Sequence, residues 1–177
     1  NKVPANQFVF PTWNGNDGTP SKSSSSFHYN DALGTLPTAT RTGYTFKGWS
    51  TSANDSVNVS TTTKVTGNVT YYAIWQINSY TLTVTAGTGG TVSGDGTYNY
   101  GETATLTATP SAGYHFVKWN DDDTNASKTV TVTGNATYTA TFEQDPYLNL
   151  DKTSLTFEAV GGTQTVNVTS NVNWTVS

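Results

Sequence analysis

The chain has 177 residues, of which only 11% are charged, and a formal net charge of −4. Its eight Lys and Arg residues form no cluster, so it lacks the positive surface that nucleic acids and anionic membranes require. It has no cysteine for disulfides, and no apolar run approaches the roughly 20 residues of a membrane span. We expect no nucleic-acid partner and no direct membrane insertion. A threonine- and aromatic-rich composition with little charge favours strands and an extracellular or cell-surface location.

The first predicted unit covers residues 1–77 and consists of short strands. Residues 8–10 form an aromatic strand, and residues 14–18 supply Asn, Gly and Asp for a turn. Residues 31–33 are expected to form a single helical turn, which a following proline ends. Residues 65–75 close the unit as a hairpin.

The second predicted unit covers residues 78–144 and alternates between apolar and polar side chains. Over residues 80–86, Tyr, Leu and Val share one face of a strand and threonines occupy the other. The same pattern of period two recurs at 104–108, 130–132 and 138–142. These segments therefore predict a sheet with one buried face.

The third predicted segment covers residues 145–177 and begins after a hinge that contains Pro146. Its candidate strands lie at residues 148–150, 155–157, 163–169 and 172–177. About 30 residues are too few for a sandwich of two sheets, which takes roughly 100 residues. Either this segment packs on something else or the chain is truncated.

One motif occurs twice in the chain. Gly43-Tyr44-Thr45-Phe46-Lys47-Gly48-Trp49 leads to a Thr-Gly-Asn turn at 66–68, and Gly113-Tyr114-His115-Phe116-Val117-Lys118-Trp119 leads to the same turn at 133–135. A spacing of about 70 residues indicates two copies of one small β domain. Aromatic residues at matched positions, such as Trp49 and Trp119, are predicted to be core. Positions that differ between the copies are where function is sought.

These motifs carry a family resemblance. The string at 43–49, with the strand at 71–75, resembles the Listeria-Bacteroides (internalin B-type) repeat, and residues 80–143 look like a divergent repeat of the same family. Residues 150–177 are similar to the opening half of a BACON domain, an immunoglobulin-like module suspected of carbohydrate or mucin binding. The resemblance implies a mainly β chain, with two tandem β-grasp-like repeats followed by a partial immunoglobulin-like segment.

The difference between the copies predicts a binding surface in the first unit. With Tyr71, Ala73 and Trp75 facing the core, Tyr72 and Ile74 lie on the opposite face, where the second unit has threonines. If Phe8 and Phe10 match Leu82 and Val84, Val9 and Trp13 also lie opposite the core. An exposed patch of Val9, Trp13, Tyr72 and Ile74 would mark an interaction site. The alternative is that the Ser-rich loop, the second unit or the tail covers it.

No residue set predicts catalysis, a metal or a cofactor. Asp121, Asp123 and Asn125 alternate as in the start of a calcium loop, but the later Gly and Glu of that motif are missing, so a polar hairpin tip is the simpler interpretation. His28 and His115 lie in different repeats without cysteine or carboxylate partners at metal spacing.

The resemblance implies a non-enzymatic module of a bacterial cell-surface or secreted protein. Its expected role is adhesion or protein/glycan interaction, with a host extracellular protein or glycan as partner. One alternative is a passive spacer that presents a neighbouring domain. Another is a carbohydrate-binding module in which sugars stack on Trp13 or Trp174. The sequence predicts no oligomeric state.

Overall fold

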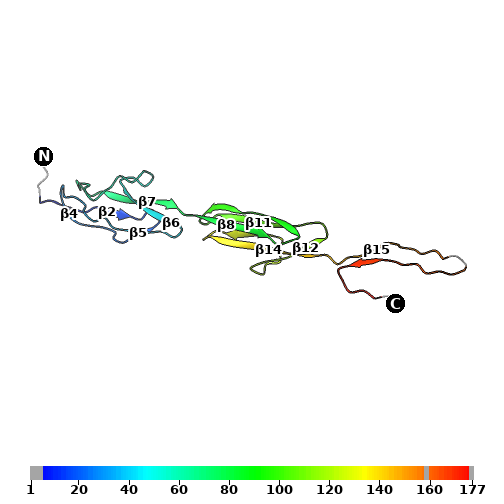
Figure 1. Cartoon of the computed structure of the whole chain (residues 1–177). Coiled ribbons are helices and arrows are strands. Elements are labelled where there is room, and N and C mark those ends of the chain that lie inside the picture. Colours follow the sequence, from blue (N-terminus) through cyan, green and yellow to red (C-terminus); the bar gives the residue numbers. More distant parts are fainter. Residues whose placement is uncertain (1–5, 158–159, 176–177) are drawn as a thin grey trace. The chain divides into compact units, whose positions relative to one another are not determined.

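The computed structural model describes residues 6–157 and 160–175, and strands are its only regular elements (Figure 1). This confirms the mainly β prediction. The helical turn expected at residues 31–33 is wrong, because Ala32 forms a β-bridge with Lys64 instead. The backbone N–H of Leu33 donates to the carbonyl of Thr63. Pairing with this distant segment holds residues 31–33 extended.

The first repeat is built from three small sheets. Its central sheet has the order β2-β7-β6, with β2 parallel and β6 antiparallel to β7. Two antiparallel pairs, β1-β4 and β3-β5, surround it. The strands are β1 (Phe8–Val9), β2 (Thr12–Asn14), β3 (Thr19–Pro20), β4 (Phe27–His28), β5 (Ala39–Thr40), β6 (Tyr44–Ser50) and β7 (Thr70–Ile77).

The second repeat has a four-stranded sheet of order β10-β8-β14-β12 and a three-stranded sheet of order β13-β11-β9. The predicted alternation is confirmed in β8, where Leu82 and Val84 are buried between exposed threonines. The strands are β8 (Ser79–Ala86), β9 (Gly90–Ser93), β10 (Gly96–Asn99), β11 (Thr103–Pro110), β12 (Tyr114–Trp119), β13 (Ser127–Thr131) and β14 (Ala136–Gln144).

Among the described residues of the third segment, β15 (Leu148–Leu150) pairs antiparallel with β16 (Val168–Ser170). The strand expected at 148–150 is confirmed, and β16 overlaps the end of the one expected at 163–169. Residues 155–157 and 172–175 form no strand, and 176–177 lie outside the described residues.

The described chain separates into two compact units whose limits differ from the predicted division at residues 77 and 144. The first unit runs to Leu82 and also takes in Asp95–Ala104 and Thr129–Ala136. The second consists of Thr83–Gly94, Thr105–Lys128 and the chain from Thr137 onward. Parts of the second repeat therefore pack with the first repeat.

Strand register confirms that the two copies are equivalent. Trp49 pairs with Ala73 in β7, and Trp119 pairs with Ala140 in β14. Each pairing follows a bulge at the same place in the motif, just after Phe46 or Phe116. Both tryptophans are fully buried, as their matched positions predicted.

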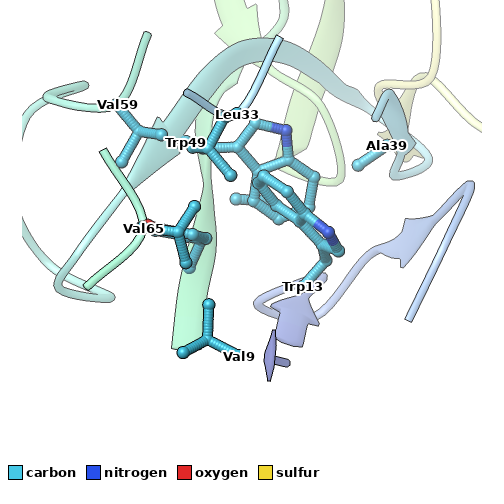
Figure 2. Packing of buried hydrophobic residues seen from close by; sticks show 9 residues of the cluster. Val9, Trp13, Leu33, Ala39, Trp49, Val59 and Val65 are labelled. Atoms are coloured by element: carbon cyan, nitrogen blue, oxygen red, sulfur yellow. The ribbon is translucent and has the colours of Figure 1, made fainter. Parts of the chain in front are cut away.

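The core of the first repeat contains two residues that the sequence placed on its surface. Val9 and Trp13 are only 3% and 4% exposed, and Figure 2 shows them in the same cluster as Trp49. The Trp13 ring lies 4.8 Å from that of Trp49 and 5.0 Å from that of Tyr71, measured between centroids. Aromatic packing therefore fixes Trp13 inside the repeat.

A hydrogen bond explains why the predicted strand parity was wrong. The backbone N–H of Phe10 donates to Asn68 Oδ1 at 2.8 Å, and the N–H of Thr81 donates to Asn135 Oδ1 at the same distance. Since the two asparagines are equivalent, Phe10 corresponds to Thr81 rather than to Val84. The match moves by three residues, and any odd shift turns a strand over, so Val9 faces the core and Phe10 faces solvent.

Candidate functional site

The four predicted binding residues do not form one exposed patch. Val9 and Trp13 belong to the core, while Tyr72 and Ile74 lie half-buried on the outer face of β7. The outward direction of Tyr72 and Ile74 agrees with the sequence argument, because Tyr71 and Ala73 between them are buried. The surface predicted from all four residues is therefore wrong, and its β7 half remains a candidate.

Phe8 and Phe10 are exposed, although the strand alternation expected from the sequence had placed their neighbour Val9 on the surface instead. They are 55% and 53% exposed, and their rings stack with centroids 6.5 Å apart. The Phe8 ring also lies 4.5 Å from that of His28 on β4. The first repeat thus displays a small aromatic cluster, but not the one predicted.

One concave surface of the first repeat surrounds Arg41, the only arginine in the chain. Arg41 lines two depressions, of about 410 Å³ and about 290 Å³. The first is lined by Asp17, Gly18, Thr19, Thr40, Arg41 and Thr42, and the second by Asn16, Arg41, Tyr44, Ala53, Asn54, Asp55, Ile74 and Trp75. We call the two depressions together the Arg41 groove. Ile74, one of the predicted binding residues, lies in its wall.

Two neighbours hold the guanidinium of Arg41 in place. It lies 3.8 Å from the centre of the Tyr44 ring, and its Nη2 is 3.5 Å from Asp17 Oδ2. The Arg41 side chain is 25% exposed and that of Asp17 is 80% exposed. Stacking on an aromatic face orients the planar group while leaving in-plane N–H donors for other partners.

A tight turn positions the acidic side of the groove. Asn16 and Asp17 have positive φ values of 47° and 69°, which Asn and Asp tolerate better than most residues. Asn16 Nδ2 donates to the carbonyls of Ala53 and Ala73 at 2.9 and 3.1 Å. These bonds fasten the turn to β7 and to the loop that lines the other side.

Trp75 also contacts this turn, through a hydrogen bond and through its ring. Its Nε1 donates to the carbonyl of Gly15 at 2.9 Å. A Cβ on Gly18 would lie 2.4 Å from the Trp75 ring, so glycine permits this close approach. The wall of the groove is therefore built from packed side chains as well as from loops.

The second repeat keeps the tyrosine of this site but lacks its arginine. The turn before β6 is closed by the N–H of Tyr44 on the carbonyl of Arg41, and the turn before β12 by the N–H of Tyr114 on the carbonyl of Ser111. Serine therefore replaces Arg41. Sequence reasoning missed this site, although a comparison of matched positions around the repeated motif would have exposed the difference.

A lysine of β13 contacts the acidic loop that joins β12 to β13 in the second repeat. Lys128 Nζ contacts Asp121 Oδ2 and lies 3.8 Å from Asp123 Oδ2. The backbone N–H of Asn125, followed by its side-chain amide and by Lys128, holds the pKa of Asp123 below its usual value. Both carboxylates of this loop thus have partners within the protein. The hairpin expected here is wrong, because β12 pairs with β14 while β13 lies beside β11 in the other sheet, so the loop connects two sheets.

The third segment has an apolar hollow of about 380 Å³, lined by Leu148, Leu150, Val166, Val168, Trp174 and Thr175. Trp174 is 46% exposed. Sugar stacking on Trp174 would need polar side chains beside the ring, and Thr175 alone supplies one in this lining. The hollow fits the carbohydrate hypothesis less well than the Arg41 groove does.

Comparisons with known proteins agree with the repeat architecture. Residues 11–74 match the Listeria-Bacteroides repeat domain, and residues 80–146 match the divergent InlB B-repeat domain. The chain is 34% identical over 135 residues to a "Putative Gly-rich membrane protein" of Evansella cellulosilytica. That match covers 71% of this chain but only 14% of the relative's length. No solved structure matches the chain.

The likeness of the third segment to a BACON domain remains a prediction, because the two family matches end at residue 146. Within residues 6–157 and 160–175 there is no helix long and apolar enough to cross a membrane.

Proposed function

We propose that the chain is a non-enzymatic, extracellular adhesion module. It carries a Listeria-Bacteroides repeat followed by a divergent InlB B-repeat, and both families are typical of bacterial surface proteins. The Arg41 groove is the proposed binding site, and a neutral host glycan is the proposed ligand. The observation that carries this proposal is the stacked, partly exposed guanidinium beside an exposed carboxylate.

The chemistry of the groove suits a saccharide. The Arg41 guanidinium donates hydrogen bonds, and the Asp17 carboxylate accepts them, so together they can bind neighbouring hydroxyl groups. Ile74 and Trp75 offer apolar contact to the C–H faces of a sugar ring. Asp17 and Asp55 outnumber the single cation, which disfavours an anionic ligand.

Binding of the full chain to arrays of neutral glycans tests this function. We expect Arg41→Gln to weaken binding about tenfold or more, as loss of a charge-assisted hydrogen bond would. Lys47→Gln is the matched control, since it removes the same charge from an exposed position on β6 outside the groove. Equal binding by wild type and Arg41→Gln, with both folded, would refute the assignment of the site.

A passive spacer is the second candidate function, and the tandem arrangement of two repeats supports it. A spacer needs repeats that hold together but no ligand. Failure of the wild-type chain to bind any glycan or extracellular protein, together with normal folding, would favour the spacer over the adhesion module.

A further inference from the structure

The glycine that opens the repeated motif makes the same backbone bonds in both copies. Gly43 and Gly113 have φ values of +78° and +75°. The carbonyl of Gly43 accepts the N–H of Asn78 at 2.9 Å, and that of Gly113 accepts the N–H of Asp145 at 2.8 Å. In each case the donor lies just beyond the last strand of the repeat, so the two sites are equivalent in backbone structure.

The two glycines differ in what covers them. A Cβ added to Gly43 would lie 2.0, 2.3 and 2.6 Å from three atoms of the Tyr100 ring. No described atom lies within 4 Å of a Cβ added to Gly113. The ring of Tyr100 therefore rests directly on the backbone of Gly43, which only a residue without a side chain permits.

Further bonds surround this contact. The N–H of Tyr100 donates to the carbonyl of Asn78 at 2.8 Å, and Thr45 Oγ1 donates to Asn78 Oδ1 at 2.6 Å. Asn78 is thus bonded on one side to the motif of the first repeat and on the other to the turn after β10. The first compact unit contains all of these residues, because it takes in Asp95–Ala104.

Tyr100 belongs to a turn that occurs at the equivalent place in both repeats. In the first repeat the N–H of Tyr29 donates to the carbonyl of Gln7 at 2.8 Å, as that of Tyr100 does to Asn78. The following residues, Asn30 and Gly101, both have positive φ, at 69° and 83°. The second repeat therefore presents a standard part of its fold to a glycine of the first.

We propose that Tyr100 seated on Gly43 is a joint that couples the unfolding of the second repeat to that of the first. The joint needs an aromatic ring in one repeat, a glycine in the other and Asn78 between them. Without the ring, only the chain and the hydrogen bonds of Asn78 connect the two repeats. The unfolding of one repeat would then depend less on the unfolding of the other. This inference does not depend on ligand binding at Arg41.

Gly43→Ala and Gly113→Ala form a matched pair for testing the joint in the full chain. Both place a side chain at a similar positive φ and carry similar backbone strain, but only Gly43→Ala collides with Tyr100. Amide hydrogen exchange of Tyr100 reports its bond to Asn78 directly. We expect exchange at Tyr100 to accelerate about tenfold or more in Gly43→Ala and to stay unchanged in Gly113→Ala.

Tyr100→Leu keeps the proposal testable if Gly43→Ala does not fold. In urea titrations followed by NMR, the amides of Ala73 and Ala140 report the first and second repeats. We expect the gap between their midpoints to widen in Tyr100→Leu relative to wild type. An unchanged gap, or equal exchange at Tyr100 in wild type and folded Gly43→Ala, would overturn the proposal.

Discussion

Truncation of Trp13 and of Phe10 to alanine tests which face of the first strands packs on the core. Trp13 is 4% exposed, contacts Trp49 and Tyr71, and donates its Nε1–H to Ser25 Oγ at 3.0 Å. Removing a buried tryptophan destabilises a protein by about 3–5 kcal/mol. We therefore expect Trp13→Ala to lower the free energy of unfolding of the first repeat by about 4 kcal/mol.

Phe10→Ala is expected to cost much less. A fully buried phenylalanine side chain contributes about 2–3 kcal/mol, and Phe10 is 53% exposed, so about half of that is lost. The backbone bond from Phe10 to Asn68 does not involve the side chain and survives the change. The expected loss is about 1 kcal/mol.

Urea denaturation followed by the NMR amide signals of Tyr71 and Ala73 measures both variants in the first repeat. Lys47→Ala, at an exposed position on β6, controls for nonspecific effects. If Phe10→Ala proves as costly as Trp13→Ala, or more so, the strand register described above would be refuted, and the parity expected from the sequence alone would be restored.

Three further predictions follow from buried or hydrogen-bonded groups. Trp49→Phe should lower the free energy of unfolding by about 1–3 kcal/mol in urea titrations, because the buried carbonyl of Pro37 loses the indole donor; no loss would contradict a role for this bond. The lowered pKa of Asp123 means that its carboxylate stabilises the fold above the ordinary value of 3.8 and that this contribution is lost as the pH falls through the lowered pKa. Asp123→Asn should therefore flatten the acid limb of the stability curve below about pH 5, and an unchanged slope would exclude this contribution. Burial raises the pKa of Tyr71 above its ordinary 10.0, so stability falls as the pH rises past that value; Tyr71→Phe should remove this part of the alkaline loss, as measured by thermal unfolding against pH.

Local patterns were sufficient to predict strands wherever apolar and polar residues alternate. In β8 and β14, threonines separate the apolar residues, so only one face can be buried and the register is defined. The duplication was equally visible, because Trp49 and Trp119 occupy the same place in a long motif and both are buried. These features depend on neighbouring residues and on spacing, which a sequence contains directly.

The proposed binding site could not be predicted in the same way. Residues 8–11 are all apolar, so alternation gives no preferred face, and Asn68, 58 residues from Phe10, decides the register. The Arg41 groove likewise combines the turn at Asp17 with Tyr44 and Ile74, which lie far apart along the chain. The sequence by itself determined the strand-rich class, the duplicated motif and its buried aromatic residues. Only the tertiary structure decided which side chains are exposed to solvent and which contact one another. Long-range hydrogen bonds and close packing select one strand register where the local sequence pattern favours neither face.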